Sequence, residues 1–152
     1  MVNVAIPPGQ TLSNGASPVQ QITYLPFGPM TSYRLNHFNQ IITRSYDANY
    51  ALTDITSAAL NLHFARDPLG NIIAEGNTAG ASPAVESYSY DPLNQLKAIT
   101  QGSTTVANLS YNPTGDRLSK AGGGLATGTY GYDAGTHHLS SIGGAARSYD
   151  AN

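Results

Sequence analysis

Apolar and polar side chains alternate over short stretches of this chain, and a polar turn follows each stretch. Large side chains stand two residues apart before three of these turns: Tyr88 and Tyr90, Leu109 and Tyr111, and Tyr130 and Tyr132. This spacing places both members of a pair on one face of a strand. After each turn the chain carries an aliphatic residue, six or seven positions beyond the residue that precedes the turn. These aliphatic residues are Leu52, Ile72, Leu96, Leu118 and Leu139. The pattern predicts an all-β chain of hairpins, each with an approach strand, a turn and a return strand.

The hairpin pattern recurs with a short period. An Asp or Asn residue marks each unit: Asp47, Asp67, Asp91, Asn112, Asp133 and Asp150. Successive marks are 20, 24, 21, 21 and 17 residues apart, which suits a β-hairpin with its connection better than a pair of helices. We therefore expect about six antiparallel hairpins, the last one truncated, in one curved sheet. Residues 75–86, 101–108 and 119–128 are rich in Gly, Ser, Thr and Ala, and they are expected to form longer connections at the opposite rim.

The residues after each Tyr position are typical of tight turns. In the stretch from Asp91 through Pro92 to Asn94, proline presets φ for a type I turn, and the carboxylate can accept backbone N–H bonds across the bend. Asn94, like Gly70 and Gly115 in parallel units, suits the left-handed position that closes such a loop. The repeated acidic residue is thus expected to cap a turn rather than to act as an acid catalyst. The set of expected turn residues is Asp47, Asp67, Gly70, Asp91, Pro92, Asn94, Asn112, Gly115 and Asp133.

The composition limits the partners that this chain can take. Charged residues make up 11% of the 152 residues and the formal net charge is −2, so no basic field is present to hold nucleic acid or anionic lipid. The absence of cysteine excludes disulfides, thiolate nucleophiles and Cys-based metal sites. No apolar run approaches the roughly 20 residues of a transmembrane helix, and the first residues lack the pattern of a signal peptide. We expect neither nucleic-acid binding nor membrane insertion.

Few residues could form a catalytic or metal site. Asp133, His138 and Ser140 lie close in the sequence, but no nucleophile-elbow motif accompanies them. His137 and His138 are adjacent, so on a strand their rings would point to opposite faces. We expect no catalytic residue, no metal site and no cofactor.

These repeats resemble the YD-repeat, or rearrangement-hotspot (Rhs) repeat, family, whose unit reads roughly Tyr-Asp-x-x-Gly-Arg-Leu-x-x-Ile. The resemblance is closest in YDPLNQLKAI (90–99) and continues in YNPTGDRLSK (111–120) and YDAGTHHLSSI (132–142). It divides the chain into an N-terminal extension (1–18) and a repeat region (19–152). The chain departs from the pattern at Tyr50, which replaces Gly, at Arg66, which replaces Tyr, and at Asn112, which replaces Asp.

The resemblance implies a spiralling shell of β-hairpins that encloses a C-terminal toxin until delivery. This chain would then be a non-catalytic wall segment of a larger exported protein, secreted or at the cell surface. Its partners would be the remainder of that polypeptide and the enclosed toxin. The side chains expected to join the hairpins are Tyr46, Tyr88, Tyr90, Tyr111, Tyr130, Tyr132, Leu52, Leu96, Leu118 and Leu139. Open terminal strands of such a segment predict self-association.

A second interpretation is a stand-alone surface module that binds carbohydrate or mediates adhesion. Aromatic rings on a β surface offer apolar faces with polar edges, which suit a sugar ring. Tyr88, Tyr90, Tyr130 and Tyr132 would make the contacts. The same aromatic residues also stabilise a sheet through cross-strand pairs, so the pattern alone leaves both interpretations open.

Overall fold

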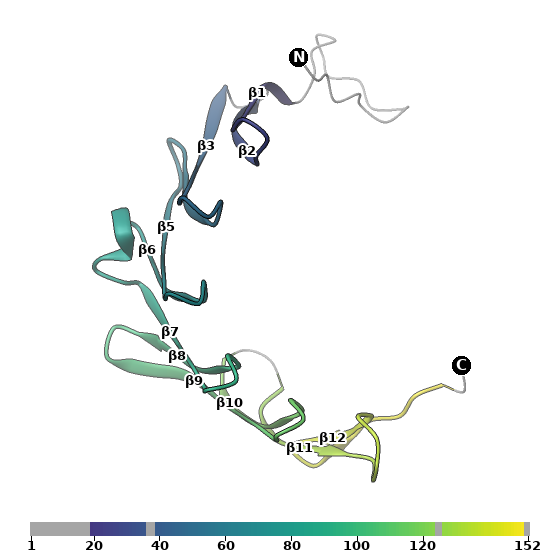
Figure 1. The fold of residues 1–152 in the computed structure, drawn as a ribbon. Helices are drawn as coiled ribbons and strands as arrows, with labels where there is room; N and C mark the ends of the chain where they lie inside the picture. The colour runs from purple at the N-terminus through teal and green to yellow at the C-terminus, as the bar shows by residue number, and fades with distance from the viewer. Residues whose placement is uncertain (1–18, 36–38, 124–125, 151–152) are drawn as a thin grey trace. The chain divides into compact units, whose positions relative to one another are not determined.

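The computed structural model describes residues 19–35, 39–123 and 126–150. The N-terminal extension expected over residues 1–18, and the last two residues of the final unit, lie outside these ranges. The chain divides into two compact units, one up to Pro83 and one from Ala84 onward. Each unit is described by itself below (Figure 1).

The described residues are all-β, with helical structure limited to one short 3-10 turn. The first unit holds β1 (Val19–Tyr24), β2 (Met30–Leu35), β3 (Gln40–Tyr46), β4 (Leu52–Thr56), β5 (Asn61–Arg66), β6 (Ile72–Gly76) and the 3-10 turn η1 (Ala79–Ala81). The second holds β7 (Glu86–Tyr90), β8 (Leu96–Gln101), β9 (Thr104–Tyr111), β10 (Arg117–Gly122), β11 (Gly128–Tyr132), β12 (Leu139–Ile142) and β13 (Ala145–Ala146). No helix in these ranges is long enough to cross a bilayer.

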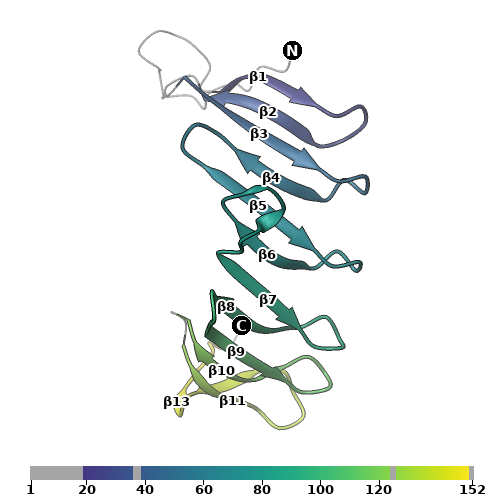
Figure 2. The same ribbon diagram turned by 90° about the vertical axis from the view of Figure 1, so that its left-hand side faces the viewer.

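Within each unit the strands lie side by side in the order of the sequence, and every neighbouring pair is antiparallel. Figure 2 shows this ladder of hairpins face on. The expected all-β architecture of tandem antiparallel hairpins is confirmed. It forms because each strand is short and alternates apolar with polar side chains. Each turn then returns the chain directly beside the strand that it has just left.

The two faces of the sheet differ in character. In β3, Ile42, Arg44 and Tyr46 are half-buried, whereas the alternate residues Ile41 and Thr43 are exposed. The half-buried face continues across the neighbouring strands, because Ile55 stands opposite Arg44 and Leu62 stands opposite Ile55. Antiparallel sheets commonly have one such apolar face and one solvated face.

Little of either unit is deeply buried. Among the described residues, the buried hydrophobic side chains are Ala81, Ala107 and Leu109, and no large side chain is fully buried. The buried Lys120 stands opposite Leu109 and donates to the carbonyl oxygen of Gly123 at 3.2 Å. Each unit is therefore a single layer of sheet, whereas ordinary domains bury an apolar face between two layers.

The expectation of three longer connections holds for 75–86, holds only in part for 119–128 and fails for 101–108. Residues 101–108 form the end of β8, a two-residue turn and most of β9, with Gln101 paired to Thr104. Gly102 supplies the positive φ of 59° at that turn, which glycine adopts without a steric penalty. Residues 119–122 likewise belong to β10. The prediction was wrong there because Ser and Thr suit both connections and solvated strand faces.

The stretch 75–86 is a true connection, and part of it folds back on the sheet. Its η1 turn packs against β5 and β6, and Ala81 is buried there. Gly76 leaves room for this approach, since a Cβ atom on it would lie 2.8 Å from the carbonyl oxygen of Pro83. One exposed face of the first unit is thus locally covered.

Candidate hairpin-stacking interface

Four turns place an Asp or Asn side chain in the same role. The Oδ1 atom of Asp91 accepts hydrogen bonds from the amides of Leu93 and Gln95, both at 2.9 Å. The backbone closes the same loop, because the Asp91 amide donates to the Gln95 carbonyl oxygen and the Asn94 amide donates to the Asp91 carbonyl oxygen. Asn94 has a φ of 59°. This is a type I turn closed by a left-handed residue, as the sequence predicts.

The same bonds recur at Asp47, Asp67 and Asn112. Each Oδ1 atom accepts the amides two and four residues later, at 2.8 to 3.0 Å. An amide oxygen therefore replaces the carboxylate at Asn112 without a change in geometry. The left-handed residues of these turns are Tyr50, Gly70 and Gly115.

Tyr50 is the unexpected member of this set, with a φ of 62°. Its ring lies against the preceding hairpin turn, so closely that a Cβ atom on Gly28 would be 2.6 Å from the Cε1 atom of Tyr50. A left-handed conformation is unfavourable for tyrosine. The contact between neighbouring turns gives a physical reason for a large side chain at this position.

The turn at Asp133 is one residue longer than the others. The Asp133 amide donates to the His138 carbonyl oxygen at 3.0 Å, so the loop closes over six residues, whereas five close the other turns. Thr136 supplies the side-chain oxygen here, because its Oγ1 atom accepts the His138 amide at 3.1 Å and donates to the Asp133 carbonyl oxygen at 3.0 Å. Asp133 begins a turn as predicted, but the side-chain cap comes from Thr136.

At several turns, the residue before the turn joins its hairpin to the preceding one. The Tyr46 hydroxyl donates to the carbonyl oxygen of Met30 at 2.7 Å, and the Tyr132 hydroxyl donates to that of Arg117 at 3.0 Å. In both cases the acceptor is the first residue of the preceding return strand. We call this contact the inter-hairpin clasp. It explains why the position favours tyrosine over phenylalanine, because only a polar tip can satisfy a carbonyl group there.

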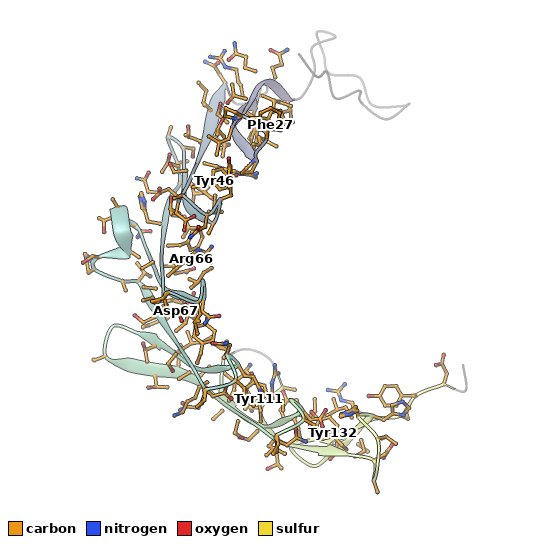
Figure 3. The ribbon with its side chains drawn as sticks, in the orientation of Figure 1. Phe27, Tyr46, Arg66, Asp67, Tyr111 and Tyr132 are labelled. Atoms are coloured by element: carbon orange, nitrogen blue, oxygen red, sulfur yellow. The ribbon has the colours of Figure 1, made fainter. Side chains whose placement is uncertain are left out.

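Arg66 makes the clasp where the sequence lacks tyrosine. Its Nη2 atom donates to the carbonyl oxygen of Leu52, the first residue of β4, at 3.1 Å. Its Nη1 atom donates to the carbonyl oxygen of Gly70 at 2.8 Å. Figure 3 labels Tyr46 and Arg66 at equivalent places in successive hairpins. The departure from the repeat pattern thus preserves the contact.

Two further tyrosines of the set, Tyr88 and Tyr130, also contact residues within their own unit. The Tyr88 hydroxyl donates to Glu86 at 2.9 Å, and the Tyr130 hydroxyl donates to the carbonyl oxygen of Ala126 at 2.8 Å. The guanidinium carbon of Arg117 lies 5.5 Å from the centre of the Tyr130 ring, within the range of a cation–π contact. Interaction with Tyr130 raises the pKa of Arg117, although partial burial opposes the change.

The return-strand leucines pair with these tyrosines where the loop length allows it. Tyr46 stands opposite Leu52, Tyr90 opposite Leu96, and Tyr132 opposite Leu139. These pairs put the apolar side chains of each hairpin on one face.

Leu118 is a correction to the predicted set. Arg117, not Leu118, stands opposite Tyr111, and 42% of Leu118 is exposed. Leu118 and Leu139 both follow their Tyr position by seven residues. Only the hairpin of Leu139 has the longer loop, and there a spacing of seven residues brings the leucine opposite its tyrosine. In the shorter loop of the other hairpin, the same spacing places Leu118 one residue beyond the position opposite Tyr111.

Two His–Asp pairs join successive hairpins, and the sequence did not reveal them. His63 Nδ1 lies 2.5 Å from Asp54 Oδ1 across β4 and β5, and His137 Nδ1 lies 2.7 Å from Asp116 Oδ1. Burial of Asp54 would raise the pKa of its carboxyl, but hydrogen bonds from His63 and Thr53 outweigh it and lower that pKa. The signal available was the position of Asp54 and His63 on either side of the short connection at 57–60.

The pair of His137 and Asp116 includes a residue of the capped turn that begins at Asn112. Hydrogen bonds from Asn112 and then His137 lower the pKa of the Asp116 carboxyl. A similar bond from Asn71 lowers the pKa of Asp67 in its own turn. Within the described ranges, no three His, Cys, Asp or Glu side chains gather closely enough to hold a metal ion.

Similarity to known proteins is found among solved structures. No family model matches the chain, and no curated protein matches it in sequence. Among solved structures, the chain is similar to a crystal structure of TcdB2-TccC3-Cdc42, with a TM-score of 0.64 and 16% identity over 86% of this chain. The match covers 8% of that chain. At this identity the similarity concerns the fold alone.

Proposed function

We propose that this chain is a non-catalytic wall segment of an Rhs/YD-repeat shell that encloses or presents a C-terminal toxin. The observation that carries the proposal is the inter-hairpin clasp, in which Tyr46, Arg66 and Tyr132 each bond to the preceding return strand. A contact repeated from hairpin to hairpin is a device for extending a sheet. The fold match to TcdB2-TccC3, a toxin component with an Rhs/YD-repeat shell, supports the same interpretation.

The single-layer architecture also favours a wall. A sheet with no large fully buried side chain in its described part leaves its apolar face half-covered, which an isolated domain of this length would normally avoid. In a shell, further hairpins and the contents would cover that face. The role assigned to the repeated residues is therefore structural: Asp and Asn set the turns, and Tyr and Arg join the hairpins.

The carbohydrate-binding alternative gains no support from the tyrosine geometry. Tyr88, Tyr130 and Tyr132 are half-buried, and their hydroxyls donate to groups within the chain. Arg117 also lies over the ring of Tyr130. A sugar ring would have to displace these contacts, so we do not propose this function.

The intact mass of the native gene product in its source cells tests the wall proposal first. We expect a product many times larger than the 15.9 kDa of this chain, together with a C-terminal portion that resists added protease until the shell is denatured. A native product near 15.9 kDa would contradict enclosure, and so would a large product whose C-terminal portion is digested as fast as a denatured control.

A further inference from the structure

The two signs of charge occupy different parts of the described fold. Asp47, Asp67, Asp91, Asp116 and Asp133 all lie in the turns that follow the approach strands. Within each unit these turns follow one rim of the sheet (Figure 2). Most acidic side chains of the repeat therefore lie at the rim and leave the faces of the sheet to other residues.

Cations stand on the apolar face of the first unit. Arg44 stands opposite Ile55, and Arg66 stands opposite Ile72. Side chains directly opposite each other in a sheet point to the same face, so both guanidinium groups lie among aliphatic side chains.

The second unit repeats this arrangement. Arg117 stands opposite Tyr111, and the buried Lys120 stands opposite Leu109. Leu109 and Tyr111 are two residues apart in one strand, so they share a face. The apolar face of this unit therefore also carries two cations.

Two carboxylates share these faces without pairing with a cation. Glu75 stands opposite Phe64 in the first unit, and Glu86 lies two residues before Tyr88 in β7 of the second. Glu86 accepts hydrogen bonds from the Tyr88 hydroxyl at 2.9 Å and from the Gln101 side chain at 2.6 Å. Among the described residues, the ion pairs are the two His–Asp pairs. Each apolar face thus has an excess of positive charge.

The guanidinium groups on these faces also lack acceptors. The Nε atoms of Arg44, Arg66 and Arg117 are buried without a hydrogen-bond partner in the described part of the chain. Arg44 lies over the ring of Tyr33, 5.6 Å from its centre, a contact that leaves the N–H edge of a guanidinium group able to donate. A cation in apolar surroundings without a counterion is unfavourable. These faces are therefore suited to receive carboxylate groups from a partner.

We propose that the apolar face of each unit binds an acidic polypeptide segment in which carboxylates are interspersed with aliphatic or aromatic side chains. The carboxylates would pair with Arg44 and Arg66 in the first unit and with Arg117 in the second, since a guanidinium group binds a carboxylate through two parallel N–H donors. The apolar side chains of the segment would cover the aliphatic and aromatic residues between these cations.

Such a segment has to approach from the direction in which the side chains point. Further strands of a longer chain extend a sheet in its plane, so they enlarge this face and do not cover it. Arg44 on β3 and Arg66 on β5 are two strands apart, which is roughly 10 Å in a sheet. An extended polypeptide spans that distance with about three residues. A polypeptide also supplies apolar side chains, which a nucleic acid or a sulfated glycan lacks.

The inference rests on the proposed function for the identity of the partner, because in a shell the acidic segment would belong to the enclosed polypeptide. The binding chemistry belongs to the face itself. Absence of binding would therefore overturn this inference and leave the wall role standing. A native product near 15.9 kDa would overturn enclosure and leave the binding result intact.

The test is fluorescence anisotropy of a dye-labelled copolymer of glutamate and tyrosine, titrated with the full 152-residue chain. The net charge of the chain is −2, so its overall charge opposes this binding, and a complex requires cations gathered in one place. We expect saturable binding of this acidic copolymer. A copolymer of lysine and tyrosine of the same length should show none.

Matched variants remove one positive charge from either face. Arg44→Gln should weaken binding of the acidic copolymer at least about fivefold, because a charge-assisted pair is lost. Arg34→Gln should stay within about twofold of the unaltered chain, since Arg34 stands opposite the exposed Ile41 on the other face. Arg117→Gln and, at an exposed position, Lys97→Gln form the same comparison in the second unit.

The inference is overturned if the acidic copolymer does not bind, or if the lysine copolymer binds equally well. It is also overturned if Arg34→Gln and Lys97→Gln weaken binding as much as Arg44→Gln and Arg117→Gln do. Circular dichroism identifies a variant that fails to fold, and the comparison in the other unit then decides. Heparin tests another occupant: tighter binding of heparin than of the acidic copolymer, lost in Arg44→Gln, would overturn the polypeptide partner and assign the face to a sulfated glycan.

Discussion

At the scale of single residues, a Tyr–Asp pair divides two tasks between neighbouring side chains. The carboxylate of Asp47 accepts the amides of Asn49 and Ala51 and so shapes its own turn. The hydroxyl of Tyr46 reaches outside the hairpin to Met30. One member of the pair therefore acts locally and the other joins the hairpin to its neighbour, which is why the two recur together.

Replacing a capping carboxylate should weaken the fold measurably. We expect Asp91→Ala to lower the free energy of unfolding by about 0.5 to 2 kcal/mol, because two amides lose their acceptor, as at a helix N-cap. Urea denaturation measures this change. Asp133→Ala is the matched control and should cost less, since Thr136 supplies the side-chain acceptor in that turn. Equal losses in the two variants would contradict this account.

Removing one clasp hydroxyl should cost about as much as one hydrogen bond. Tyr132→Phe leaves the carbonyl group of Arg117 without its donor, and we expect a loss of about 0.5 to 1.5 kcal/mol in unfolding free energy. Tyr24→Phe is the comparison, because Tyr24 is 53% exposed, and its effect should stay within about 0.5 kcal/mol. Thermal unfolding of both variants measures the difference. The clasp is not stabilising if the Tyr132→Phe variant has the same melting temperature as the unaltered chain.

At the scale of elements, loop length decides which side chains meet across a hairpin. The six-residue loop at Asp133 brings Leu139 opposite Tyr132, and the shorter loop at Asn112 brings Arg117 opposite Tyr111. Because strand side chains alternate between faces, one residue of difference moves a side chain to the other face.

This register has a direct consequence for two leucines. Leu96 stands opposite Tyr90 and is half-buried, whereas Leu118 is 42% exposed. We expect Leu96→Ala to lower the unfolding free energy by about 1 kcal/mol or more, and Leu118→Ala to change it by less than about 0.5 kcal/mol. If chemical denaturation shows Leu118→Ala to be the more costly change, the register in the fourth repeat unit is incorrect.

The pair of Asp54 and His63 between β4 and β5 makes the stability of the fold sensitive to acid. The folded-state pKa of Asp54 lies below its unfolded value, which is about 3.9 for a free aspartate. Its contribution to stability is therefore present above that value and is lost as the pH falls through the lower folded-state pKa. Unfolding free energy measured from pH 6 to pH 3 should fall more steeply for the unaltered chain than for Asp54→Asn. Asp150→Asn, at an exposed carboxylate, serves as the control and should keep the steep profile.

At the scale of the whole molecule, a single-layer sheet cannot bury its apolar face by itself. The described residues include exposed large side chains at hairpin turns, among them Phe27, Leu69 and Leu93. Exposed apolar surface and unpaired strand edges both promote association. We therefore expect the isolated chain to sediment as larger species when its concentration is raised; a sharp monomer at the highest soluble concentration would count against a wall segment with open edges.

The sequence by itself determined the strand alternation, the repeat and the chemistry of most turns. These features depend on residues within one turn of each other, such as Asp91, Pro92 and Asn94, and the physics of such turns is local. The same local logic allowed Asn112 to be placed correctly as a turn residue. It also located a tyrosine at the end of most approach strands, without showing what its hydroxyl contacts.

Only the tertiary structure decided the partners that lie far along the chain. The clasp acceptors are 14 to 16 residues from Tyr46, Arg66 and Tyr132, and each requires two hairpins to be already aligned. Strand register likewise decides that Asp54 pairs with His63, and that Arg117 rather than Leu118 stands opposite Tyr111. Register depends on the number of residues in each loop and on the face that neighbouring strands bury, so side-chain types along one strand cannot determine it.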